Sequence, residues 1–404
     1  MTTNPTVATS QTPSVSRLET AALVALLLFV ASVQWSIAIS QILLTVVVIL
    51  WLVILLVKQE SLDLPPICLP LLAYVLLTMV SVATSIDPIV SLIDSKEVLL
   101  FLIVPVVYRL ARGHRATTLA SVIISVGSVA ALYGIVQYGI LEYDQLGQRP
   151  QGSMGHYMTY SGLLMLVISL ATARLLFGTR GRLWVSLVLP ALLVALALTF
   201  TRSAWVGACC GVGFLLILKD LRLLAILPVI TAIFFILAPA ELTNRAYSIF
   251  DLQDPTNRDR FAMARAGIRM IKDYPLTGVG PDMVQATYAD YRDEGAVNQV
   301  NPHLHNVPLH IAAERGLPTL GAWLWFIVVA FRQLIQQFRK PQSLALAAGG
   351  LAAITSMLTA GMFEYNFGDS EFLMLLLVIL ILPAAASQET TESSGVSNNL
   401  NVIS

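Results

Sequence analysis

Long apolar runs recur along almost the whole chain, and they constrain its fold more than any other feature. A helix that crosses a bilayer needs roughly 20 predominantly apolar residues, and runs of about that length alternate here with polar connections. Hydrophobic residues make up 56% of the chain and charged residues 12%, whereas soluble domains average roughly 25% charged residues. The chain is therefore expected to be an all-α, polytopic membrane protein.

The apolar runs predict about twelve membrane spans, which place both termini on the same side of the bilayer. The spans are expected near 20–37, 39–57, 66–84, 97–112, 117–140, 157–178, 183–200, 203–218, 222–239, 317–338, 343–364 and 369–386. The resulting domains are a disordered tail at 1–19, nine helices over 20–239, a polar loop domain at 240–316, three helices over 317–386 and a disordered tail at 387–404. No Lys or Arg precedes Arg17, so the first span is expected to be an uncleaved anchor.

Basic residues in the short loops indicate the orientation, because Lys and Arg are retained on the cytoplasmic side. They gather in the loops on the side of the termini, for example at Arg17, Lys58 and Arg109, and are scarce in the short loops on the other side. The tails are therefore expected in the cytoplasm, and the loop domain 240–316 on the outer face of the membrane.

A histidine and an amide residue stand close to the tenth predicted span. His305-Asn306 is followed, after nine residues, by Gly316-Leu317-Pro318-Thr319. This position puts a titratable side chain at the bilayer edge, where water and lipid-borne substrates meet. His305 is thus a candidate catalytic base, and Asn306 a candidate for orienting its ring or the substrate. A histidine that only makes interfacial hydrogen bonds remains the alternative.

Two neighbouring histidines raise the question of a metal site. On a helix, His303, His305 and His310 would spread around the axis, and no nearby Cys completes a tetrad, so no metal is expected. His303 remains a candidate for substrate binding. Glu314 is expected opposite His305 on the same helix, as a partner of Arg315 or as a further substrate contact.

Residues 257–272 predict an amphipathic, cationic helix at the membrane surface. Phe261, Ala264, Ile268 and Ile271 would form its apolar face, and Arg258, Arg265, Arg269 and Lys272 the opposite one. These charges suit lipid headgroups or water, and Arg258 and Arg265 are also candidate substrate contacts. Arg260 falls at the edge of the apolar face, where it would be partly desolvated and would need an internal carboxylate or a substrate phosphate.

Three further outside residues are candidate contacts. Arg202, between two predicted spans, would either snorkel at a helix end or hold a diphosphate with its planar donor fork. Arg149 and Tyr291 lie in polar outside segments that suit either sugar binding or a solvated interface.

Three of these elements occur in an order that resembles the O-antigen ligase superfamily of bacterial membrane glycosyltransferases. They are Thr201-Arg202-Ser203-Ala204-Trp205, then Arg260 with its helix and the turn Pro275-Leu276-Thr277-Gly278-Val279-Gly280, and last His305-Asn306 before Gly316. The resemblance covers about residues 150–335. It implies a GT-C-like protein of the bacterial inner membrane with a large, mostly helical periplasmic loop, and neither a metal nor a nucleotide cofactor.

The resemblance also implies a reaction. A glycan would pass from undecaprenyl diphosphate to lipid A-core oligosaccharide or another glycan acceptor, with inversion and without metal. Arg202 and Arg260 would bind the diphosphate while His305 takes the acceptor proton; membrane lipid is an expected partner and nucleic acid is not. Glycan polymerases and protein O-oligosaccharyltransferases share this donor and remain open. A lipid-linked glycan transporter is a different class, although the polar groups gather at the outer edge of the membrane instead of its midplane.

Overall fold

The computed structural model describes residues 13–294 and 296–388. This part of the chain is helical and contains no strand, only one isolated antiparallel bridge between Gln145 and Gln148. The all-α prediction is therefore confirmed. Five helices, α2, α6, α7, α9 and α14, are long and apolar enough to cross a membrane by length and composition, which supports a membrane protein.

The elements follow one another along the chain with short connections. The first half comprises α1 (Pro13–Ser32), α2 (Ile37–Lys58), α3 (Cys68–Ala83), α4 (Pro88–Asp94), the 3-10 helix η1 (Ser95–Leu102), α5 (Ile103–Leu110), α6 (His114–Gly139), α7 (Tyr157–Phe177), α8 (Arg182–Leu198) and α9 (Arg202–Lys219). The second half comprises η2 (Leu221–Ala225), α10 (Ile226–Leu237), α11 (Ala240–Tyr247), α12 (Pro255–Asp273), α13 (Val284–Tyr291), α14 (Val307–Phe338), α15 (Leu344–Ala360), η3 (Asn366–Gly368) and α16 (Ser370–Ala386).

The centre of the bundle is built from α7, α9, α15 and α16. Almost every residue of α16 is buried, and α15 packs against both α7 and α9. Small residues let the backbones approach closely. A Cβ atom on Gly211 of α9 would lie 2.0 Å from Ser356 Oγ of α15, and one on Gly207 would lie 2.9 Å from the Ser356 carbonyl oxygen. These four helices support the end of the molecule that carries the polar cluster described below.

The helices coincide with most of the predicted apolar runs, but some boundaries differ. The runs at 97–112 and 222–239 are each divided between a 3-10 helix and an α-helix, η1 with α5 and η2 with α10. The segment 1–19 was expected to be disordered, yet α1 begins at Pro13; residues 1–12 and 389–404 lie outside the described residues. The count of twelve spans and the domain bounds remain predictions.

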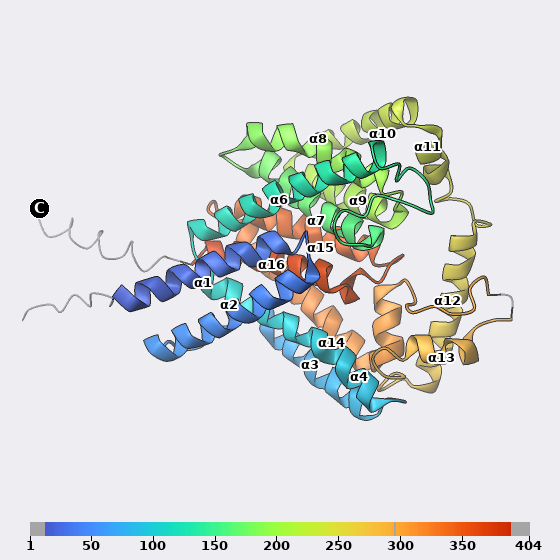
Figure 1. Ribbon diagram of the computed structural model, residues 1–404, viewed down its shortest axis with the longest axis horizontal. Helices are drawn as coiled ribbons and strands as arrows, with labels where there is room; N and C mark the ends of the chain where they lie inside the picture. The colour runs from blue at the N-terminus through green and yellow to red at the C-terminus, as the bar shows by residue number, and fades with distance from the viewer. Residues whose placement is uncertain (1–12, 295, 389–404) are drawn as a thin grey trace, which may run out of the picture.

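The segment between α10 and α14 forms α11, α12 and α13 at one end of the bundle, opposite the end where α1 begins (Figure 1). Helix α12 is present as predicted, and its predicted apolar face is not the one that packs against the rest of the protein. Phe261 is 54% exposed and Ile268 48% exposed, whereas Ala262, Ala266 and Met270 are buried. The helix packs through its small residues: a Cβ atom on Gly267 would lie 2.7 Å from Leu304 Cδ1.

Backbone hydrogen bonds at a kink in α14 attach this segment to the bundle. The backbone is non-helical at Gly316, with φ 81°, and Pro318 follows. The Leu317 amide donates to the Pro275 carbonyl at 2.9 Å, and the Gly280 amide donates to the Glu314 carbonyl at 2.9 Å. A Cβ atom on Gly278 would lie 2.2 Å from that same Glu314 carbonyl oxygen. The turn at 275–280 is thus a structural clasp whose glycines permit close backbone contact.

Candidate functional site

A polar pocket of about 550 Å³ lies where the start of α14 meets the turn between α15 and α16. His305 reaches it from the last loop before α14. Its Nδ1 lies 2.8 Å from Glu364 Oε1, and Glu364 belongs to the turn between α15 and α16. The expectation that His305 and Glu314 share a helix is wrong, because α14 begins at Val307 and His305 has a left-handed backbone, with φ 46°. Such a conformation costs energy outside glycine and is typical of functional sites.

Hydrogen bonds made by Asn306 and Val307, the two residues after His305, hold this histidine opposite Glu364. Asn306 Oδ1 accepts a hydrogen bond from the Leu309 amide at 2.9 Å and so caps α14. Its Nδ2 donates to the Met362 carbonyl at 3.1 Å, and the Val307 amide donates to the Gly361 carbonyl at 2.7 Å. The polar atoms of Asn306 are therefore engaged within the protein, and the residue orients His305 through the backbone.

The contact between His305 and Glu364 shifts the pKa of both side chains. Burial by itself lowers the pKa of His305, but the charge and the hydrogen bond of Glu364 outweigh burial and hold that pKa above its usual value. Burial raises the pKa of Glu364, and the facing His305 more than reverses this, so the pKa of Glu364 lies below its usual value. The imidazole is thus a strengthened base whose Nδ1 side is held by a carboxylate.

The rings of His305 and His310 both lie near the ring of His303, contrary to the expectation that the three histidines spread around a helix axis. The His303 ring centroid lies 5.6 Å from Tyr365, 5.8 Å from His310 and 6.2 Å from His305. Burial, followed by the charges of His310 and His305, lowers the pKa of His303 to about 4. In the described part of the chain, no group of three or more His, Cys, Asp and Glu side chains could hold a metal ion.

Glu314 takes no part in the His305 pocket. It is 2% exposed, pairs with Arg315 at 2.7 Å and with His310 Nε2 at 3.2 Å, and accepts the Asp282 amide at 3.0 Å. The expected partnership with Arg315 is therefore present. These contacts indicate that Glu314 stabilises the structure beside the kink of α14.

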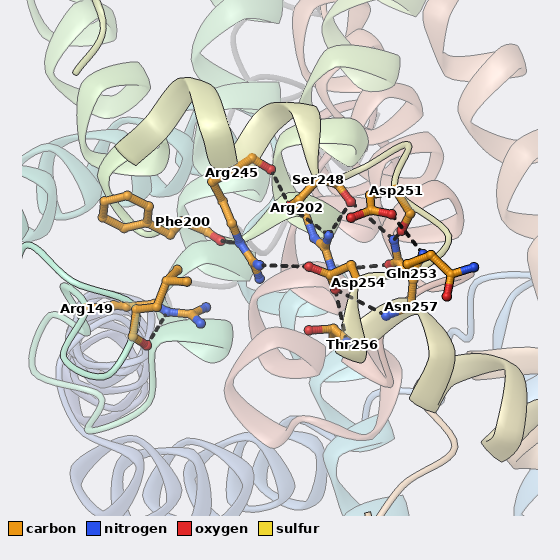
Figure 2. A network of polar contacts seen from close by, with 11 residues as sticks. Arg149, Phe200, Arg202, Arg245, Ser248, Asp251, Gln253, Asp254, Thr256 and Asn257 are labelled. Atoms are coloured by element: carbon orange, nitrogen blue, oxygen red, sulfur yellow. Dashed lines mark hydrogen bonds and ion pairs between the residues drawn. The ribbon is translucent and has the colours of Figure 1, made fainter. Parts of the chain in front are cut away.

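A second polar cluster lies at the beginning of α9 (Figure 2). Arg202 is only 5% exposed. Its Nη1 donates to the carbonyl and to the hydroxyl of Ser248 at 2.6 and 2.9 Å, and its Nη2 donates to Asp254 Oδ1 at 3.1 Å and to Asn257 Oδ1 at 3.2 Å. It is thus neither a snorkelling charge nor an open donor fork. Its hydrogen bonds connect the start of α9 to the loop before α12 and to the first turn of that helix.

Arg245 belongs to the same cluster, and sequence reasoning missed it. Burial and the neighbouring charges of Arg202, Arg149 and Arg260 lower its pKa to about 10, although Asp254 opposes them. Figure 2 shows Arg149 and Arg202 on either side of Arg245. Arg149, Arg202 and Arg245 form an arginine cluster, and Asp254 is the carboxylate that opposes their positive charge at Arg245. No motif in the sequence signals Arg245, because it lies 43 positions beyond Arg202 on a different helix.

Arg260 lies between this arginine cluster and the His305 pocket. Both Glu364 and Asp254 act on its charge, and burial lowers its pKa. Its buried Nε has no hydrogen-bond partner among the described residues. A buried N–H group without a partner is costly, and an anionic ligand would relieve this cost.

The other predicted contacts are distributed over the surface around the site. Arg258 is exposed. Arg265 is bonded to Asp293 at 2.5 Å, and the Tyr291 hydroxyl donates to Asp273 at 2.9 Å. The Arg149 guanidinium lies 4.2 Å from the ring centroid of Tyr157, which directly follows the pocket residue His156. Of the predicted substrate contacts, His303 alone lines the His305 pocket itself.

Comparison with known families found a match. Residues 185–324 match the family model described as O-antigen ligase. The matched range contains Arg202, Arg245, Arg260 and His305, while Glu364 lies beyond its end. No curated protein matches the chain. The match covers residues 185–324 of the 404 and supports a relationship of this part of the chain to the O-antigen ligase superfamily.

Proposed function

We propose that this protein is a glycosyltransferase of the O-antigen ligase type. It moves a glycan from undecaprenyl diphosphate to lipid A-core oligosaccharide at the periplasmic face of the bacterial inner membrane. One observation carries the proposal: His305 and Glu364 meet at 2.8 Å in a polar pocket, next to an arginine cluster, in a chain with an O-antigen ligase family match.

His305 supplies the base in this proposal. With Nδ1–H donating to Glu364, the lone pair on Nε2 is free to accept the proton of an acceptor hydroxyl. The hydroxyl oxygen then attacks the anomeric carbon from the face opposite the diphosphate. As the new glycosidic bond forms, the bond from carbon to the phosphate oxygen breaks, and its electron pair leaves with undecaprenyl diphosphate. The anomeric configuration is inverted, and no metal takes part.

The arginines supply the charge that stabilises the leaving diphosphate. Arg260 is assigned the direct contact, because its Nε is buried and lacks a partner among the described residues. Arg202 positions the start of α12 through Asp254 and Asn257, and its charge, together with that of Arg245, adds to the field that favours a diphosphate. Guanidinium groups suit this task because their fork matches phosphate oxygens.

Transfer of a purified undecaprenyl diphosphate glycan tests the proposal. The donor is incubated with native protein and EDTA, once with lipid A-core and once without an acceptor. Glycan on lipid A-core is the expected product. Longer carrier-linked glycan in the absence of lipid A-core would instead indicate a polymerase. If neither product forms, a parallel assay of donor movement across proteoliposomes distinguishes the transporter class.

A further inference from the structure

The pocket around His305 differs sharply in charge from the arginine cluster beside it. Three carboxylate side chains line it, from Glu364, Asp369 and Glu371, together with the hydroxyl of Thr159. None of its described lining residues is Arg or Lys. The cationic and the acidic side chains are therefore separated into two adjoining regions.

Two residues that line the pocket carry buried acceptor oxygens without a donor among the described residues. Asn366 lines the pocket and is 8% exposed, and its Oδ1 has no hydrogen-bond partner among the described residues. The same holds for Glu364 Oε2, whose sister oxygen holds His305. Leaving a buried acceptor unpaired is unfavourable, so these two oxygens favour a ligand that brings donor groups.

The acidic side of the pocket is held in place by the start of α16. Asp369 Oδ1 accepts the Phe372 amide at 3.0 Å, and the Thr159 hydroxyl of α7 donates to Asp369 Oδ2. Glu97 accepts a hydrogen bond from the Ser370 hydroxyl at 2.8 Å, directly beside Glu371. The carboxylates therefore sit on a rigid helix end and not on a free loop.

We propose that this pocket is the acceptor subsite, and that it selects an uncharged, hydroxyl-rich sugar residue over one that carries a phosphate or a carboxylate. The assignment as an acceptor subsite rests on the proposed function. Sugar hydroxyls donate hydrogen bonds and can satisfy Asn366 Oδ1 and Glu364 Oε2. At pH 8 a phosphate offers only hydrogen-bond acceptors, and ionised carboxylates in the pocket would repel it.

The separation of charge also explains how one site keeps its two substrates apart. The diphosphate of the donor is attracted by Arg260 and the arginines around it and is repelled by Asp369 and Glu371. The acceptor sugar has no charge that would draw it toward the arginines. His305 lies at the junction of the two regions, so the acceptor hydroxyl meets the donor at the base.

Binding of small sugars tests this selection without any transfer. The protein is placed in nanodiscs free of glycosidic detergent, and saturation-transfer difference NMR at pH 8 measures the dissociation constants of methyl glucoside, methyl glucoside 6-phosphate and methyl glucuronide. The charged sugars are expected to bind at least about tenfold more weakly than the neutral one. Glu371→Lys is expected to reduce that ratio at least about tenfold, and Glu371→Gln to reduce it less. Asp290→Asn, an exposed carboxylate on α13, is the control that leaves the ratio unchanged.

Equal binding of the three sugars, tighter binding of the phosphate, or no binding of methyl glucoside contradicts the inference, as does an unchanged ratio in a folded Glu371→Lys protein. The ligase proposal fails separately. A protein that prefers methyl glucoside but transfers no glycan to lipid A-core refutes the proposed function alone, whereas an active ligase that binds all three sugars equally refutes the inference alone.

Discussion

His305 and Glu364 are 59 residues apart in the chain, yet their side chains meet at 2.8 Å. The contact joins the loop before α14 to the turn after α15, and a backbone hydrogen bond from the Val307 amide to the Gly361 carbonyl holds both segments in register. A base oriented in this way presents one defined nitrogen to the substrate. The relationship gives Glu364 a positioning role that its own stretch of sequence does not reveal.

Replacing Glu364 should change the pH dependence of transfer. Glu364 holds the pKa of His305 above its usual value, and a base works in its neutral form, so native activity rises as His305 loses its proton above about pH 6.5. In Glu364→Gln this rise should move to lower pH, and the plateau rate should fall at least about tenfold because the ring is less well oriented. A kcat profile measured from pH 5 to 9 checks this, with Asp290→Asn as control. An unshifted profile rules out the pairing in the working enzyme.

Arg202→Ala should destabilise the folded protein. The change leaves Asp254 half-buried without its main partner, and breaking such a pair costs about 3 kcal/mol. Arg202→Lys should lose less, because the charge remains while the planar fork is lost. Thermal unfolding in detergent gives the comparison, with the exposed Arg258→Ala as control. Native stability in Arg202→Ala would show that the cluster at Ser248 and Asp254 is not structural.

Unlike Arg202→Ala, Arg260→Ala should reduce glycan transfer without lowering thermal stability. The buried Nε of Arg260 has no hydrogen-bond partner among the described residues, so removal of this side chain should leave thermal stability unchanged or slightly higher. Transfer should fall about 100- to 1000-fold, because a charge that stabilises the leaving diphosphate is lost. Measuring the melting temperature and kcat on the same preparation separates Arg260 from Arg202. A destabilised but active variant would reverse the two assignments.

The clasp at the kink of α14 should not tolerate a side chain at Gly278. Its φ of +69° is unfavourable for alanine, and the added Cβ atom would lie 2.2 Å from the Glu314 carbonyl. Gly278→Ala should therefore lower stability by about 1–3 kcal/mol. Gly321→Ala is the matched control on α14, since nothing lies within 4 Å of its added Cβ. Equal unfolding of the two variants in a denaturant series would contradict the clasp.

The helical fold was predictable because apolar runs are a local signal. The position of α12 was likewise predictable, but its buried face was not. Its larger apolar residues, Phe261 and Ile268, are exposed. Its small residues Ala262 and Ala266 are buried against other parts of the protein. Sequence hydrophobicity ranks Phe above Ala, and it cannot show that close helix packing needs Ala262 and Ala266.

The candidate site was predictable in part. His305 could be singled out because it stands shortly before an apolar span, and Arg260 because it falls at the edge of the predicted apolar face of its helix. Their partners could not, since Glu364 and Arg245 come close only when helices distant in the chain assemble. The occupation of Arg202 by Ser248, Asp254 and Asn257 also depends on tertiary contacts. Hydrogen bonds of this kind leave no period or motif in the sequence.

The most direct test of the central claim is the rate of glycan transfer by His305→Ala, measured with purified undecaprenyl diphosphate glycan and lipid A-core at saturating donor. The account predicts a loss of about 100- to 10,000-fold in kcat, as expected for removal of a general base, with native donor binding and native melting temperature. A His305→Ala protein that transfers glycan at the native rate would contradict the account.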